Sequence, residues 1–163
     1  MFGGWKRLSF KENDAFIDRA RQFCAKKVAK DYKDEYKLSP MEVYSQVVNG
    51  KNYKVLLVGK HFKNGDLKCF SGVTYVAAGP KPQPVFQDNT FKAVDGKDCT
   101  LAADKKDKLA KAVADYFKGA KDFEAVKVFE LDGANVYVLK VGDDFYGAFE
   151  CGDVCEVDCH IRK

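Results

Sequence analysis

Apolar residues recur every three or four positions over residues 11–36, with lysine, arginine and aspartate on the opposite side. This spacing is that of an amphipathic helix that packs one face on a sheet. Ser9-x-x-Glu12 resembles a capping box, and Asn13 is an alternative N-cap. Pro40 favours extended backbone at Ser39 and ends the helical pattern. The apolar face consists of Phe16, Ile17, Ala20, Phe23, Cys24, Val28, Tyr32 and Tyr36.

The next segment predicts a β-hairpin. Residues 41–48 and 51–58 are rich in β-branched and aromatic side chains and flank Asn49-Gly50. Asn-Gly is favoured in a two-residue type I′ turn, in which both residues have positive φ. Val47 and Val48 stand beside this turn. Because hairpin tips are normally polar, these valines either contact a partner or end a buried strand.

Further strands are expected over 66–77 and 85–94, followed by a boundary at 95–98. Thr100 or Asp104 can cap a second helix, and Gly119 is a plausible stop. Two more strands, 123–131 and 134–141, follow with a turn between them. The apolar face of the second helix consists of Leu109, Val113, Tyr116, Phe117 and Ala120.

The two halves of the chain resemble each other. A shift of 83 residues places Asn49-Gly50 on Asp132-Gly133 and Val55-Leu56 on Val138-Leu139. Both halves then have the order helix, strand, turn, strand, strand. The interpretation is a tandem repeat, and the alternative is a chance likeness of two amphipathic hairpins.

The amino-acid composition excludes some classes of binding partner. Hydrophobic residues make up 46% of the 163, and the net charge is +4 from 28 basic and 24 acidic residues. Without a basic block or a run of ~18 apolar residues, we expect neither nucleic acid nor membrane as a partner. Six cysteines favour disulfides and secretion. Residues 1–6 lack the pattern of a signal peptide, so a cytoplasmic location is the alternative.

Catalytic chemistry is not indicated. His61 and His160 are far apart, and no nucleophile has an evident base, so we expect no enzyme, no cofactor and no metal site. Cys151, Cys155 and Cys159 are spaced by four residues, whereas zinc ligands usually pair at shorter spacing. We interpret them as disulfide partners or inert thiols. Their candidate partners are Cys24, Cys69 and Cys99.

Gln46-Val47-Val48-Asn49-Gly50 has the form Gln-x-Val-x-Gly, which resembles the inhibitory first hairpin of the cystatins. That family blocks papain-like cysteine proteases. Gly3-Gly4 stands where cystatins carry the glycine of an N-terminal binding trunk, and a long helix separates it from the hairpin. Leu38-Ser39-Pro40 resembles the family's helix-to-strand connection. The resemblance covers roughly residues 2–93.

The resemblance implies an α+β, cystatin-like fold, in which a long helix is wrapped by an antiparallel sheet, here duplicated. Its units would be an inhibitory one over 1–96 and a degenerate one over 97–163. The implied function is reversible, tight-binding inhibition of papain-like cysteine proteases of the cathepsin type. The implied protease-binding residues are Gly3, Gly4, Gln46, Val47, Val48, Asn49, Gly50, Pro82 and Gln83.

Two departures from the family pattern support an alternative, a non-inhibitory cystatin-fold binding or scaffold protein. The family usually carries Pro-Trp in its second binding hairpin, where this chain has Pro82-Gln83-Pro84. The second unit places Glu130 and Asp132 at its hairpin tip, where charges would be desolvated in an apolar subsite. Cystatin-like folds also exchange their first hairpin, which leaves a monomer and a hairpin-swapped dimer open.

Overall fold

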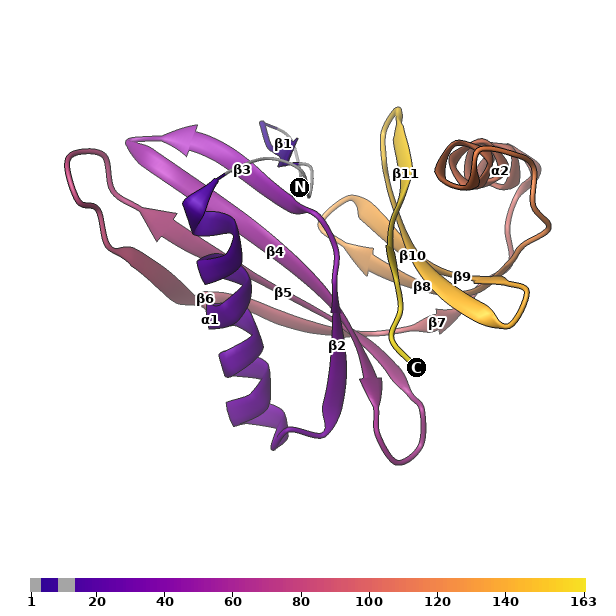
Figure 1. Ribbon diagram of the computed structural model, residues 1–163, viewed down its shortest axis with the longest axis horizontal. Helices are drawn as coiled ribbons and strands as arrows, with labels where there is room; N and C mark the ends of the chain where they lie inside the picture. Colours follow the sequence, from indigo (N-terminus) through magenta and orange to yellow (C-terminus); the bar gives the residue numbers. More distant parts are fainter. Residues whose placement is uncertain (1–3, 9–13) are drawn as a thin grey trace. The chain divides into compact units, whose positions relative to one another are not determined.

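The computed structural model describes residues 4–8 and 14–163 (Figure 1). Antiparallel strands dominate this part of the chain, with 51% of residues in strands and 21% in helices. The described residues form two helices and two sheets. The predicted fold class, a duplicated cystatin-like α+β fold in which a long helix is wrapped by an antiparallel sheet, is wrong, because antiparallel sheet predominates over helix. No helix in the described ranges is long and apolar enough to cross a bilayer.

The chain divides into two compact units between Ala93 and Val94. The division predicted from the sequence lies between residues 96 and 97. Each unit contains one helix, one sheet and its own cluster of buried apolar side chains.

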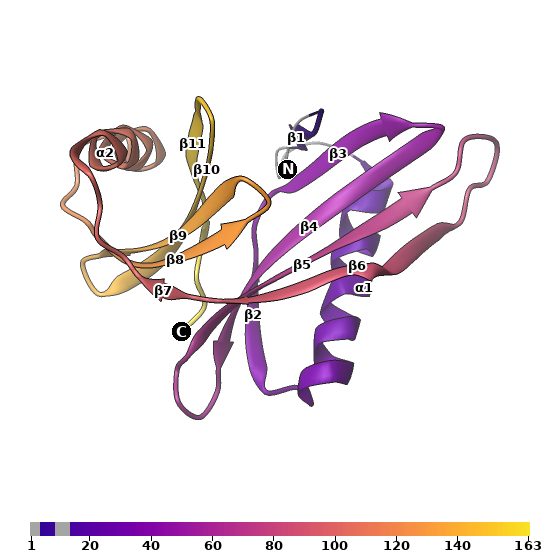
Figure 2. The same cartoon turned by 180° about the vertical axis from the view of Figure 1, so that it is seen from behind.

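The first unit is built on a six-stranded sheet with the order β1-β3-β4-β5-β6, in which β2 also pairs with β4 (Figures 1 and 2). β4 and β5 are its long central pair, joined in register from Lys51 opposite Val76 to Lys60 opposite Leu67. The elements are β1 (Lys6–Leu8), α1 (Ala15–Tyr32), β2 (Tyr36–Pro40), β3 (Val43–Val48), β4 (Gly50–His61), β5 (Leu67–Val76) and β6 (Pro84–Asp95).

Helix α1 is shorter than the predicted span of 11–36. Asp14 is its N-cap, and the Asp14 carboxylate accepts a hydrogen bond of 2.9 Å from the backbone N–H of Phe16. The helix ends because Lys33 and Asp34 adopt left-handed conformations, with φ of 54° and 55°. The chain then runs back as β2. The predicted caps Ser9 and Asn13, and Glu12 of the capping box, lie outside the described residues.

One face of α1 packs on one face of the sheet (Figure 2). Its buried positions, Ile17, Ala20, Cys24 and Val28, recur at helical spacing, as the sequence predicts. The sheet contributes alternate residues of β4, such as Val55 and Leu57, because successive side chains point to opposite faces. The remaining buried members of this core are Leu8, Val43, Tyr53, Phe70 and Val76.

Strand β6 lies at one edge of this sheet. Its ladder with β5 contains a side-chain bridge at Thr90. The backbone N–H of Val73 donates to Thr90 Oγ1 at 2.8 Å, and the Thr90 hydroxyl donates to the Gln87 carbonyl at 2.6 Å. The Thr90 side chain thus links β5 to the backbone of β6.

The second unit has a five-stranded antiparallel sheet with the order β11-β10-β9-β8-β7. Leu109, Ala112 and Val113 of α2 pack on apolar residues of the sheet, including Tyr137 and Leu139. The elements are β7 (Lys97–Asp98), α2 (Ala103–Phe117), β8 (Glu124–Leu131), β9 (Ala134–Val141), β10 (Asp144–Cys151) and β11 (Val154–His160).

The ends of α2 differ from the prediction. Ala102 is the N-cap and makes no side-chain capping bond, so neither Thr100 nor Asp104 caps the helix. Lys118 ends it in a left-handed conformation, with φ of 55°, one residue before the predicted stop at Gly119.

The cysteines are distributed over both units, and all six are thiols in the structure. Cys151 ends β10, whereas Cys155 and Cys159 lie on β11. The expected disulfides remain a prediction.

Candidate functional site

The tip of the β3–β4 hairpin exposes two valines. Val47 is 81% exposed and Val48 is 44% exposed, although they continue the strand whose earlier residues, Val43 and Tyr44, are buried. Of the two readings that the sequence left open, the structure excludes a buried strand end. The tip therefore offers apolar surface to solvent.

The turn itself differs from the predicted type I′ geometry. Val48 pairs with Gly50, so Asn49 alone separates the two strands. Gly50 has a φ of 107°, and Asn49 is not among the described residues with positive φ. The predicted geometry occurs instead in the second unit. There Leu131 pairs with Ala134, and Asp132 and Gly133 have φ values of 45° and 88°.

Strand β5 holds this tip from one side. The Tyr75 hydroxyl donates a hydrogen bond to the backbone carbonyl of Asn49. A Cβ placed on Gly50 would lie 2.4 Å from the Val76 carbonyl oxygen and 2.9 Å from the Tyr75 hydroxyl. Only glycine fits at this position, because the space is closed and the backbone is left-handed.

Asp14 fixes the base of the hairpin to the start of α1. Its carboxylate accepts a hydrogen bond of 2.8 Å from the Tyr53 hydroxyl and one of 3.4 Å from Lys51 Nζ. Burial raises the pKa of Asp14, but hydrogen bonds from Phe16 and Tyr53 and the charge of Lys51 outweigh it, so the pKa is lowered overall. Burial and the neighbouring carboxylate raise the pKa of Tyr53.

The N-terminal segment lies beside the same hairpin. Lys6 of β1 pairs with Ser45 of the antiparallel strand β3, so Trp5 and Gly4 lie on the side of the tip. Gly4 is exposed, has a φ of 80°, and a Cβ placed on it would lie 3.6 Å from Gln46 Nε2. The amide of Asn52 donates to Gln46 Oε1 at 3.4 Å. The structure thus brings Gly4 to the first residue of the motif.

Gly3 lies outside the described residues. Trp5 is half-buried, and the Lys54 ammonium stands 5.2 Å from the centre of its ring. Trp5 therefore packs over the hairpin, which the sequence did not predict.

The loop between β5 and β6 begins at the hairpin tip (Figure 1). The Cα of Ala77, its first residue, would lie 3.1 Å from a Cβ on Gly50. Pro82 is half-buried and Gln83 is exposed. Val85, at the start of β6, is 57% exposed. Val85 was not named from the sequence as a candidate contact residue. Its position directly after a proline-rich loop could have indicated an exposed apolar side chain.

Comparison with known proteins gives no assignment. No family model matches the chain, and no match is found among curated proteins or solved structures. The resemblance to the cystatins therefore rests on the residues quoted from the sequence.

The second unit contains a buried carboxylate that sequence reasoning missed. Glu150 Oε1 accepts hydrogen bonds of 3.0 Å from both Lys105 Nζ and Asn135 Nδ2. Burial raises the pKa of Glu150, but these two bonds and the charge of Lys105 lower it overall. Lys105, Asn135 and Tyr137 also line a hollow of about 370 Å³.

The groups around Glu150 are poor nucleophiles at neutral pH. Burial raises the pKa of Tyr137 to about 12 and that of Cys155 to about 11, and Glu150 adds to both shifts. Burial also raises the pKa of Cys99, which lines the same hollow. Because the thiolate is the reactive form, these protonated thiols suit a structural role.

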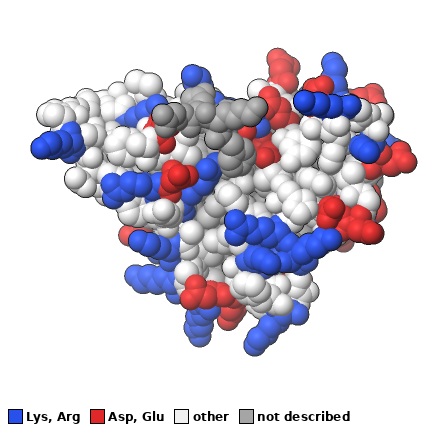
Figure 3. Space-filling model, in the orientation of Figure 1, with Lys and Arg blue, Asp and Glu red and all other residues white. Residues whose placement is uncertain are grey.

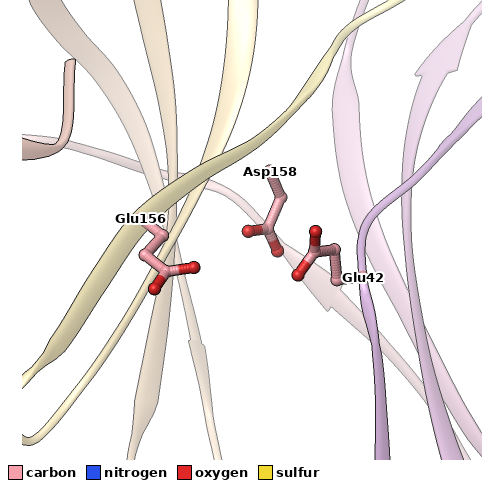
Figure 4. Close-up of side chains that lie close together, drawn as sticks. All are labelled: Glu42, Glu156 and Asp158. Carbon is pink, nitrogen blue, oxygen red and sulfur yellow. The ribbon is translucent and has the colours of Figure 1, made fainter. Parts of the chain in front are cut away.

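Three carboxylates are labelled in Figure 4. Glu156 and Asp158 lie two residues apart on β11 in the second unit. Glu42 lies just before β3 in the first unit, where its Oε2 stands 2.7 Å from Arg7 Nε. Glu42 is thus balanced by a cation of its own unit.

Proposed function

We propose that this protein is a reversible inhibitor of papain-like cysteine proteases, and that its first unit plugs the active-site cleft. The inhibitory surface, called here the wedge, consists of Gly4, the Gln46–Gly50 tip and the loop 77–83. The observation that carries the proposal is the exposure of Val47 and Val48 within a Gln-x-Val-x-Gly motif.

The energetics of the tip suit a plug. Burying a valine that was exposed in solution contributes ~1.5 kcal/mol or more, and Val47 has most of its surface available for this. The tip is held in place before binding by the hydrogen bond from Tyr75 and by the close approach of Gly50 to Val76. A pre-ordered tip loses less conformational entropy on binding, which raises affinity.

Gly4 has a separate role in this proposal. Its backbone is exposed and left-handed and lies beside Gln46, so Gly4 can approach the enzyme's main chain closely. The wedge fills the cleft without placing a peptide bond at the catalytic thiolate. Inhibition is then reversible and independent of catalysis.

A titration of papain and a panel of cathepsin-type proteases tests the proposal. A tight inhibitor gives a linear, stoichiometric loss of activity, and dilution of the complex restores that activity. Lack of inhibition across the panel at micromolar protein would refute the function.

The second unit calls for a different role. Its corresponding tip buries Phe129 and Leu131 and exposes Glu130 and Asp132. This tip has no apolar side chain to insert into a cleft, and desolvating its carboxylates would be costly. We therefore propose that residues 94–163 act as a binding or scaffold unit. Deleting the Gln46–Gly50 tip of the first unit should leave the role of this second unit unchanged.

A further inference from the structure

The wedge end of the first unit is electropositive. The described segments that build it, residues 4–8, 44–54 and 74–86, contain no Asp or Glu. They contain five cationic residues, Lys6, Arg7, Lys51, Lys54 and Lys81. The whole chain, by comparison, has a net charge of +4 from 28 basic and 24 acidic residues. In Figure 3 the outermost part of the left-hand end, where Figure 1 places the β5–β6 loop, is white and blue.

Two of these cations are balanced by neighbouring acids. Lys51 stands 3.4 Å from Asp14, and Arg7 stands 2.7 Å from Glu42. Lys54 is buried against Trp5. Lys6 and Lys81 are exposed, Lys6 on β1 and Lys81 in the β5–β6 loop, and these two segments lie beside the apolar tip.

We infer that the wedge selects papain-like proteases whose cleft walls carry a net negative charge. This inference rests on the proposed function and names the class of target. Exposed charges beside an apolar contact act mainly during approach, because they steer the encounter and remain hydrated in the complex. Lys6 and Lys81 should therefore set the association rate, whereas Val47 and Val48 set the lifetime of the complex.

Charge reversal at the two exposed lysines separates these roles. The test variant is Lys6→Glu with Lys81→Glu, and the control is Lys26→Glu with Lys63→Glu. The control changes the net charge equally but places the change on α1 and on the β4–β5 turn, where both lysines are exposed. Stopped-flow measurements with proteases of acidic and of basic cleft walls give association and dissociation rates for each variant.

With an acidic cleft, the association rate of the native protein should fall at least ~10-fold as ionic strength rises from about 0.02 to 0.5 M. The test variant should associate ~10-fold more slowly at low salt and dissociate at an unchanged rate. The control should stay within about twofold of the native protein. Proteases with basic cleft walls should associate slowly with the native protein and faster with the test variant.

Equal association rates for test and control variants, or rates independent of salt, would overturn the inference while inhibition itself persists. If no protease of either kind is inhibited, the proposed function fails and this inference falls with it.

Discussion

The hydroxyl of Tyr75, on β5, donates a hydrogen bond to the backbone carbonyl of Asn49 at the tip of the neighbouring hairpin. This bond joins a residue of the sheet's central pair to the one residue that separates β3 from β4. The tip is therefore held from outside its own hairpin.

Removing this hydroxyl should loosen the tip without unfolding the unit. Tyr75→Phe is expected to raise the dissociation rate from papain-like proteases about three- to tenfold. This loss corresponds to one hydrogen bond of ~1 kcal/mol. Tyr116→Phe, a change at an exposed tyrosine of α2, is the matched control. Equal dissociation rates for both variants would show that the bond does not order the tip.

A charge at the exposed valines should abolish inhibition and spare the fold. For Val47→Asp and Val48→Asp we expect loss of protease inhibition, with the free energy of unfolding within about 0.5 kcal/mol of the native value. Val154→Asp makes the same change at a valine of the second unit that is 43% exposed, and should inhibit normally. Enzyme titration and urea unfolding measure the two effects. A collapse of stability would mean that the valines belong to the core.

Glycine at position 50 should be required for steric reasons. Gly50→Ala would bring Cβ to 2.4 Å from the Val76 carbonyl oxygen, so we expect a loss of ~2 kcal/mol or more. Gly79→Ala is the control, because Gly79 has a φ of 119° but no atom within 4 Å of a Cβ placed there. This control should lose only the ~1 kcal/mol that left-handed backbone costs a residue with a side chain. Similar losses in the two variants would contradict the predicted clash.

Stability at low pH should depend on Asp14. Its pKa is lowered in the folded protein below the ordinary value of 3.8. A lowered folded pKa stabilises the protein above the unfolded pKa, and this contribution is lost as pH falls through the folded pKa. Asp14→Asn keeps an N-cap side chain but removes the charge.

The native protein should therefore be more stable than Asp14→Asn at pH 7, and the difference should shrink below about pH 4. Urea unfolding from pH 7 to pH 2.5 measures it. Asp88→Asn, at an exposed position of β6, should leave the curve unchanged. A constant difference across this range would exclude the charge of Asp14 as the cause.

The sequence predicted local elements better than it predicted their assembly. The β-branched and aromatic content located β4 closely, the strand expected over 66–77 matches β5, and the helical period identified the buried face of α1. The end of α1 was missed because Tyr36 continues the apolar spacing, whereas Lys33 and Asp34 stop the helix without a glycine or proline signal. The fold class failed for a related reason, since local patterns do not reveal how many sheets the strands form.

At the candidate site, the turn that the local sequence favours differs from the turn that the folded protein contains. Asn49-Gly50 carries the strongest short-range signal for a type I′ turn, yet Asn49 alone separates the two strands and β5 packs closely on Gly50. Asp132-Gly133, which carries a similar signal, adopts the expected geometry. The contribution of Tyr75 was not predictable, because it depends on the register between β4 and β5.

The side-chain bridge at Thr90 also bears on self-association. An open sheet edge is a template for strand addition when its backbone groups are evenly spaced and its surface is flat. At β6 the hydroxyl of Thr90 is engaged by β5, and the neighbouring side chains of Asp88 and Lys92 are exposed and charged. A second chain adding to β6 would have to bring its strand against these charges, which disfavours fibril growth along this sheet.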